Sequence, residues 1–503
     1  MTFNSIHFLI FLPIVILLYW LVPHKFRWVI LLIASYYFYM SWNPQLVFLI
    51  LGTTAVSYFS GILIEKAEKK STKKLVMAVG VLICLGVLIF FKYSNFLMQS
   101  VYDFLNLFGM DLSYTALKLI LPVGISFYTF QTLSYIIDVY RGTFKAERHF
   151  GYYALFVSYF PQLVAGPIER PGTLIPQLKE EHFLNKDDFL CGMRIMLLGF
   201  FRKCVISDIV GIFVKNAFAN LDNANSLSMM VTGLLFLIQI YCDFAGYSEI
   251  ATGVARMMGV KLTRNFDRPF LSQGFGEFFR RWHITLGRWL ADYVYIPLGG
   301  NRKGTIRKEL NMMIVFIVCG LWHGASWNYA LWGLYLGVFI CLEDVLVKPF
   351  LKYLGSKGVN IKGGLIVWTR RIITMILFIP ASLIFAAEDV SQIGQIYAKL
   401  FHFEALNAVY FNNFTSCLGL TAMGGIFLAI ALISLPIAYY YGEYGRSMDI
   451  RLLDDNPVYP KTKNNSIYSI HCLTSIMMVF MVAFCWIYLS STGDLSSFAY
   501  FQF

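Results

Sequence analysis

Residues 76–91 read VMAVGVLICLGVLIFF, a run without one charged side chain. With its neighbours the run covers 75–92, close to the roughly 20 apolar residues that a helix needs to cross a bilayer. Comparable runs recur along the whole chain. Hydropathy predicts spans at 5–22, 28–42, 45–63, 75–92, 116–139, 190–217, 226–249, 309–321, 327–347, 370–387, 415–440 and 466–489. The sequence therefore predicts an all-α, polytopic membrane protein of about 11–12 transmembrane helices, with re-entrant and interfacial helices between them.

The composition supports a membrane protein and argues against a nucleic-acid partner. Of 503 residues, 58% are hydrophobic and only 14% are charged, and the mean hydropathy is +0.62. This is too little charge to cover soluble domains of such a size. The formal net charge of +12 comes from Lys and Arg in short loops between apolar runs. Such residues set topology and contact anionic lipids, so we expect membrane lipids and no nucleic acid among the partners.

The basic loops also predict an orientation. If Met1 lies outside, every loop rich in Lys and Arg falls on the cytoplasmic side: 24–27, 65–74, 141–149, 256–308, 348–362 and 441–463. The loops at 41–45, 220–228 and 387–392 carry almost none. We therefore expect both termini to be extracytoplasmic. Residues 1–22 have no basic n-region and no small-residue cleavage site, so we interpret them as a retained helix rather than a signal peptide.

The domain organisation is expected to be simple. We find no internal repeat and no low-complexity linker, which predicts one membrane-embedded domain over residues 1–503. Two segments, 152–178 and 267–300, are neither clean spans nor ordinary loops, and irregular backbone at membrane depth persists only where it is buried or lines a cavity. The nine cysteines are scattered without C-x-x-C pairs. We expect them to be packing residues, and we expect no metal site.

Residues 277–290, EFFRRWHITLGRWL, alternate aromatic and aliphatic residues with arginine at helical spacing. This pattern predicts a basic amphipathic helix at the cytoplasmic interface. Guanidinium groups pair well with phosphate, so Arg268, Arg280, Arg281 and Arg288 would suit a nucleotide-bearing donor. An ordinary surface-anchoring helix would show the same arginines, and the sequence leaves both interpretations open.

Residues 320–328, GLWHGASWN, break two apolar runs and place His323 at membrane depth. An ionisable group there is expected to be functional, although a histidine bonded to a neighbouring helix is the alternative. Gly320 and Gly324 would allow close approach of other backbone or of substrate. Histidine suits removal of a proton from a hydroxyl near neutral pH. No Gly-x-Ser-x-Gly elbow and no His-x-x-x-His spacing accompanies it.

Five strings in order carry a family resemblance: YCDFAGYS at 241–248, NFDRPF at 265–270, RRWH at 280–283, DYVYIPLGG at 292–300 and LWHG at 321–324. Together with VAGPI at 164–168 they resemble the membrane-bound O-acyltransferases. The chain is most similar to their bacterial branch that acetylates alginate-like exopolysaccharide or peptidoglycan.

The resemblance implies a helical fold around a funnel or tunnel across the bacterial plasma membrane, with core motifs over about 116–347. It implies His323 as the catalytic residue and His283 as a second histidine near the cytoplasmic entrance. Acetyl-coenzyme A would be the donor substrate, with no bound cofactor. The candidate substrate-binding residues are Arg280, Arg281, Arg288, Trp322, Asn328 and Asp243. We further expect Asn328 and the amides near Gly324 to stabilise the oxyanion. At 332–337, WGLYLG lacks the histidine that many relatives carry before the last glycine.

The end of the chain, FAYFQF at 498–503, resembles the F-x-Y-x-x-F tail of this family. There the resemblance implies that the hydroxyl of Tyr500, within a C-terminal region of about 415–503, receives the acyl group outside the membrane. An aromatic belt at the outer interface is the alternative. A serine-hydrolase-like (SGNH-type) partner would then pass the group to a polysaccharide.

Other functions stay open at this point. One is transfer of D-alanine or another acyl group to a cell-wall polymer. Another is a transporter or flippase of an acylated glycan, for which Asp138, Asp243 and Glu249 could be coupling sites. A scaffold that only recruits an outer enzyme is the third.

Overall fold

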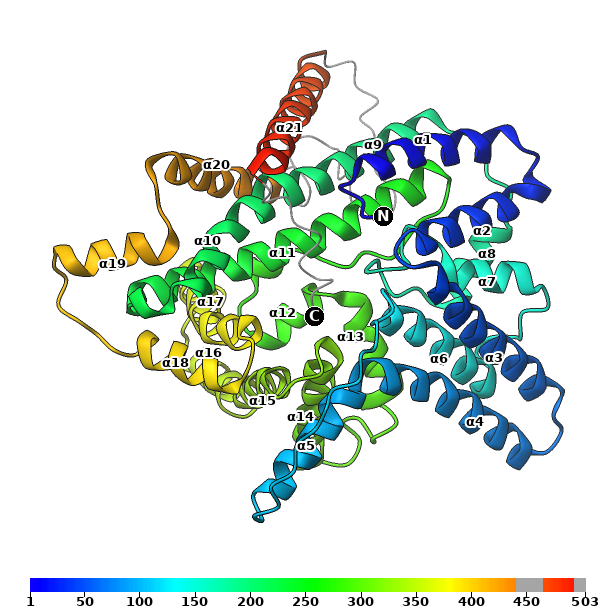
Figure 1. Ribbon diagram of the computed structural model, residues 1–503, viewed down its shortest axis with the longest axis horizontal. Helices are drawn as coiled ribbons and strands as arrows, with labels where there is room; N and C mark the ends of the chain where they lie inside the picture. The colour runs from blue at the N-terminus through cyan, green and yellow to red at the C-terminus, as the bar shows by residue number, and fades with distance from the viewer. Residues whose placement is uncertain (440–464, 493–503) are drawn as a thin grey trace. The chain divides into compact units, whose positions relative to one another are not determined.

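The computed structural model describes residues 1–439 and 465–492, and Figure 1 traces them. All regular secondary structure in this part of the chain is helical, which confirms the predicted all-α class. Contacts divide the chain into two compact units. Unit 1 is Met1–Met193 with Ala251–Thr263, and unit 2 is Arg194–Ile250 with Arg264–Phe503. The single domain expected from the sequence stays a prediction.

Unit 1 contains the first eight α-helices, the start of α9 and the end of α11. Their bounds are α1 Ile6–Leu21, α2 His24–Met40, α3 Val47–Lys66, α4 Lys70–Leu88, α5 Ser94–Asn106, α6 Ile125–Arg141, α7 Phe150–Ser158 and α8 Pro171–Lys179, with short helices η1 Pro44–Leu46 and η2 Ile89–Tyr93. Helix α3 packs against both α4 and α6. Small residues make this possible: a Cβ on Gly61 would lie 2.5 Å from the ring of Tyr135, and close approach of this kind is how helices pack in a membrane.

Unit 2 contains the rest of α9 and of α11 and all the later helices, drawn from green to red in Figure 1. The bounds of the whole helices follow. They are α9 Lys186–Phe200, η3 Phe201–Ser207, α10 Asp208–Ala219, η4 Leu221–Asn223, α11 Ser226–Met257, η5 Pro269–Leu271, α12 Phe275–Arg281, α13 Ile284–Leu290, η6 Ala291–Tyr295, α14 Thr305–His323, α15 Trp327–Leu342, η7 Glu343–Val347, α16 Lys348–Ser356, α17 Gly364–Ala386, α18 Val390–Leu400, α19 Ala408–Leu418, α20 Ala422–Tyr439 and α21 Asn465–Thr492. Helices α14 and α15 form a tightly packed hairpin.

Glycines bring the two helices of this hairpin together. A Cβ on Gly333 of α15 would lie 2.2 Å from the carbonyl oxygen of Phe316 on α14. At the break between the helices, a Cβ on Gly324 would lie 2.0 Å from the ring of Tyr329. The close approach at Gly324 is therefore made by an aromatic side chain and not by the backbone or substrate that the sequence suggested.

Six described helices are long and apolar enough to cross a membrane: Pro44–Lys66, Lys70–Asn106, Ser226–Met257, Trp327–Ser356, Gly364–Ala386 and Leu473–Ser490. A seventh results if Ala408–Leu418 and Ala422–Ala438, bent by 73°, form one span. The protein is thus a multi-pass membrane protein. The expected total of 11–12 is larger, because several apolar runs are short or interrupted. Helix α1 has 16 residues, and 190–217 is broken by the π-helix η3, which contains Arg202 and Lys203.

The span expected at 116–139 is wrong in its first part. Residues 116–122 are not helical, and α6 begins only at Ile125. Pro122 disfavours helix at the preceding residue. Gly124 then adopts φ +73°, where a Cβ would meet the carbonyl oxygen of Leu163 at 2.7 Å. A proline and a left-handed glycine packed against backbone therefore delay the helix.

Candidate active site

His283 occupies a tight corner between the short helices α12 and α13. Its backbone is left-handed, with φ 45° and ψ 53°, a conformation that costs a non-glycine residue about 1–3 kcal/mol. The side chain is 3% exposed, and its ring packs edge-on against Phe244 of α11 with centroids 4.6 Å apart. Strain of this kind persists only where the surroundings impose it, so the corner is a strong candidate for function.

Asn265 holds this corner from the preceding segment. Its side-chain Oδ1 lies 3.1 Å from His283 Nδ1 and accepts a hydrogen bond of 2.9 Å from the hydroxyl of Thr285. Its backbone carbonyl accepts from the N–H of Ile284 at 2.9 Å. Asn265 belongs to the 265–270 motif, but sequence reasoning did not single it out.

His323 is the last residue of α14 and is 8% exposed. Aromatic rings surround it: Trp322 at 4.9 Å between centroids, Trp332 at 5.3 Å and Phe385 at 5.2 Å. The ring of Trp322 also lies 5.9 Å from that of His283. The predicted Trp322 therefore contacts both histidines.

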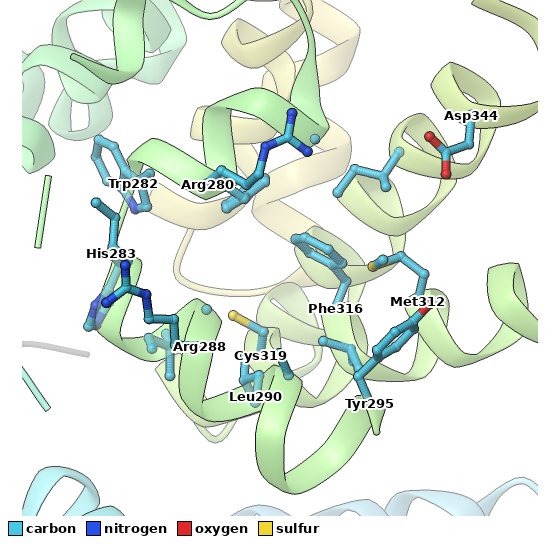
Figure 2. Close-up of a pocket in the computed structure, with 18 of the residues that line it drawn as sticks. Arg280, Trp282, His283, Arg288, Leu290, Tyr295, Met312, Phe316, Cys319 and Asp344 are labelled. Atoms are coloured by element: carbon cyan, nitrogen blue, oxygen red, sulfur yellow. The ribbon is translucent and has the colours of Figure 1, made fainter. Parts of the chain in front are cut away.

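A cavity of about 570 Å³ brings the two histidines together within unit 2. His283 and His323 both line it, with α12, α13, η6, α14 and α15 supplying walls that are mainly apolar. Figure 2 shows His283 and Arg288 on one side of the cavity and Met312 and Tyr295 on the other. The predicted irregular segment 267–300 supplies much of this wall, as expected from its sequence.

The cavity is also lined by cations. Arg280, Arg288 and Lys348 border it, and Lys348 pairs with Asp344, which borders it too. Within residues 1–439 and 465–492, neither Arg280 nor Arg288 is in an ion pair with a carboxylate. These two guanidinium groups are therefore available to an anionic ligand.

The other two predicted arginines are engaged elsewhere. Arg281 pairs with Glu277 at 2.8 Å on its own helix, and Arg268 pairs with Asp267 at 2.9 Å. Neither lines the cavity. The tertiary structure thus separates four arginines that look alike in the sequence.

A second, much smaller cavity of about 50 Å³ borders His323 on another side. Its other walls are aromatic or aliphatic apart from Ser382, and they come from α11, α12, α15 and α17. Phe236, Leu237 and Phe385 are among them. This chamber is a small, mainly apolar space beside the histidine.

Among the described site residues predicted from the sequence, Asp243 and Asn328 line neither cavity. Asp243 is completely buried and pairs with Lys203 at 2.9 Å. Asn328 is 1% exposed, and its Nδ2 donates a hydrogen bond of 2.7 Å to the carbonyl of Ala387. Only its second N–H is left for an oxyanion. Tyr500 lies outside the described residues.

Sequence reasoning gave no role to several cavity residues: Tyr295 stands within the 292–300 string, and the others belong to no motif. Tyr295, Met312, Phe316 and Cys319 line the cavity from η6 and α14. Their helical spacing on α14 indicates only an apolar face. Among the described residues, no three His, Cys, Asp or Glu side chains are grouped closely enough to hold a metal ion.

Burial and then the nearby imidazole of His323 lower the pKa of His283 well below its usual range. His283 lies outside the six candidate spans. Both effects favour the neutral imidazole, which can accept a proton or a hydrogen bond.

Comparison with known proteins agrees with this geometry. Residues 148–378 match the profile of MBOAT, the membrane-bound O-acyltransferase family. The chain is 37% identical to the probable alginate O-acetylase AlgI of Pseudomonas aeruginosa over 406 residues. The aligned region covers 80% of this chain and 75% of the relative. The chain belongs to the membrane-bound O-acyltransferase family.

Two further relatives extend the comparison. The peptidoglycan O-acetyltransferase of Helicobacter pylori is 35% identical over 342 residues, 62% of this chain and 63% of the relative. The teichoic acid D-alanyltransferase of Streptococcus thermophilus is 28% identical over 247 residues, 45% of this chain and 57% of its own length. Membership of the membrane-bound O-acyltransferase family identifies the protein as an acyltransferase, in place of the transporter and scaffold alternatives.

Proposed function

We propose that this acyltransferase takes an acetyl group from cytoplasmic acetyl-coenzyme A and delivers it for O-acetylation of an extracytoplasmic polysaccharide. One observation carries the proposal. A single cavity of about 570 Å³ is lined by His283, His323 and two arginines without carboxylate partners among the described residues. The names of the alginate and peptidoglycan relatives support acetyl as the group and a polysaccharide as the acceptor.

In the proposed reaction His323 acts as general base. Its imidazole removes the proton from an acceptor hydroxyl, whose oxygen forms a bond to the thioester carbonyl carbon. The carbon–sulfur bond then breaks, and the thiolate takes the proton from the imidazolium to leave as coenzyme A. The sequence suggested Asn328 and the amides near Gly324 as oxyanion donors. Asn328 lines neither cavity and the N–H of Gly324 donates to the carbonyl of Gly320 at 3.4 Å, so both groups would have to turn towards the thioester to act in this way.

Charge supports a nucleotide-bearing donor. Arg280 and Arg288 border the cavity and are available to an anion. Guanidinium binds phosphate in a bidentate manner, so these two side chains would hold the phosphates of coenzyme A. Arg281 is already paired with Glu277 and would contribute less.

Size supports a short acyl group. The chamber of about 50 Å³ beside His323 is small, and its mainly aromatic walls favour a short acyl group such as acetyl. D-alanine is the alternative short acyl group, and its ammonium would have no carboxylate partner among the described residues that line this chamber.

The outward steps of the proposal depend on orientation. We propose a location in the bacterial plasma membrane with both termini extracytoplasmic, following the distribution of Lys and Arg. The hydroxyl of Tyr500 would then receive the acetyl group outside, and an SGNH-type partner would pass it to the polysaccharide. The chain carries no Gly-x-Ser-x-Gly elbow of its own.

Labelled donor tests the proposal. Membranes containing the intact protein, with an outer acetyltransferase partner, receive acetyl-coenzyme A labelled in the acetyl group, and label is measured on the protein and on surface glycan. We expect label that His323→Ala abolishes and that Tyr500→Phe removes from the protein. His402→Ala, at an exposed histidine, is the matched control. Equal label with and without His323, or no label with verified folding and donor access, would overturn it.

A further inference from the structure

We propose that Asn265 is a positioning residue that holds His283 in the tautomer protonated on Nδ1, so that Nε2 carries the lone pair. The inference rests on the proposed function, because it assigns His283 a chemical state in the same cavity. Asn265 has no proposed contact with the substrate and acts only through the imidazole of His283.

The hydrogen bonds around Asn265 identify which end of its amide is the oxygen. The backbone N–H of Thr285 points at Oδ1 from 3.3 Å, and a backbone N–H can only donate. At the other end, Nδ2 donates to the hydroxyl of Ser248 on α11 at 3.3 Å. The atom that faces His283 is therefore an acceptor.

An acceptor at this position fixes the proton on the ring. Nδ1 of His283 lies 3.1 Å from Oδ1 of Asn265, and two acceptors cannot bond, so Nδ1 must donate. In a neutral imidazole the other nitrogen then holds a lone pair. The alternative tautomer would place a lone pair against the amide oxygen within the same distance.

Asn265 fixes the position of the ring as well as its proton. Its backbone carbonyl accepts from Ile284, the residue that follows His283. One residue thus clamps the strained left-handed corner on the ring side and on the backbone side. A single substitution can remove the ring contact and leave the backbone contact in place.

The charged groups around the imidazole of His283 affect its titration in a pH experiment. Phe244 of α11 supplies an apolar face. Arg280 of α12, Arg288 of α13 and His323 of α14 line the same cavity. All three are cationic or can become so. Asp344 of η7 and Lys348 of α16 also line the cavity and pair with each other.

The first experiment measures the tautomer without requiring turnover. The full-length protein, labelled with ¹⁵N and ¹³C in histidine and placed in lipid nanodiscs, is compared by NMR with His283→Gln, so that the difference spectrum isolates His283. We expect the signature of a proton on Nδ1, which Asn265→Ala converts to a mixture. A proton on Nε2 in the unsubstituted protein would overturn the inference. Because the spectrum is independent of acetyl transfer, a failure of the proposed function would leave this result unaffected and would be recognised separately.

The second experiment measures the pH profile of acetyl transfer. Asn265→Asp keeps an acceptor of the same size and adds a negative charge, which favours the imidazolium form of His283. The acidic limb of the pH profile of acetyl transfer should therefore shift upward by about 1 to 2 pH units. Asn265→Ala should lower kcat about 10- to 100-fold, as loss of an orienting partner does elsewhere, with little change in KM. Asn216→Ala, which removes an asparagine bonded to a backbone carbonyl in the same unit, controls for general loss of structure. An unshifted profile in Asn265→Asp would contradict the inference.

Discussion

The carbonyl oxygen of Tyr329 on α15 lies where a side chain on Gly320 of α14 would have to be: a Cβ there would stand 2.1 Å from that oxygen. Since the obstacle is backbone, no rotamer change can relieve it. The contact lies one turn before His323, so the spacing of the two helices and the position of the histidine are set together.

Gly320→Ala should therefore separate α14 from α15 and displace His323. Overpacking of this kind costs about 1–3 kcal/mol, and we expect a lower melting temperature in detergent together with a loss of acetyl transfer. Gly86→Ala is the matched control, because nothing lies within 4 Å of its Cβ position. Equal behaviour of the two variants would show that the hairpin tolerates the added methyl group.

Arg280→Ala and Arg288→Ala should each raise the KM for acetyl-coenzyme A about 10-fold or more, since a hydrogen bond to a charged group contributes about 1.5–3 kcal/mol. Steady-state kinetics with purified protein measure the change. Arg281→Ala should raise KM less, because Arg281 is held by Glu277 at 2.8 Å. If Arg281→Ala raises KM the most, Arg280 and Arg288 are not the main donor-binding arginines.

Leu237→Ala should enlarge the small chamber beside His323 and raise the rate with propionyl-coenzyme A relative to acetyl-coenzyme A about 10-fold, the scale of one methylene in an apolar pocket. Competition between the two labelled donors measures the ratio. Leu234→Ala, at an exposed leucine on the same helix, should leave the ratio unchanged. An unchanged ratio in Leu237→Ala would mean that the acyl group binds elsewhere.

Asp243→Asn should lower the amount of folded protein without changing the KM of the molecules that fold. Lys203 is fully buried between Asp243 at 2.9 Å and Asp208 at 2.7 Å, and removing one partner of a buried ion pair costs about 3–5 kcal/mol. Size-exclusion chromatography in detergent and kinetics on the folded fraction separate the two effects. A raised KM with normal folding would restore Asp243 as the substrate-binding residue expected from the sequence.

Glu169→Gln should reduce the dependence of thermal stability on pH. Burial raises the pKa of Glu169 to about 7, in spite of hydrogen bonds from Thr263. The folded state therefore holds a proton that the unfolded state releases near pH 4.5, and stability falls as the pH rises from there to about 7. The loss is about 3 kcal/mol at pH 8, so the variant should gain stability relative to the parent between pH 5 and pH 8. Melting curves across this range, with the exposed Glu180→Gln as control, test the sign.

Much of the site was predictable because its candidate functional residues stand in short sequence motifs. His323 and its glycines stand in one nonapeptide, and His283 stands among the arginines of 277–290. Both histidines line one cavity. Asn265 could not be chosen in the same way, because its importance is a distance of 3.1 Å to a ring 18 positions away.

The spans were harder to predict than the class. Hydropathy gives about twelve apolar runs, yet within residues 1–439 and 465–492 six helices meet the requirement of length and composition. A window average does not register that Gly124 is left-handed or that Arg202 and Lys203 are buried in a π-helix. Those features depend on partners far away in the chain.

The sequence by itself determined an all-helical membrane protein, its acyltransferase family and the two histidines, because hydropathy and motif order are local properties that survive any packing. Only the tertiary structure decided which cations border the cavity and which residue orients His283. It also showed that the carboxylate of Asp243 is in an ion pair with Lys203. Arg280 and Arg281 are neighbours in the chain, but a helix turns each residue by about 100°. One therefore borders the cavity and the other pairs with Glu277.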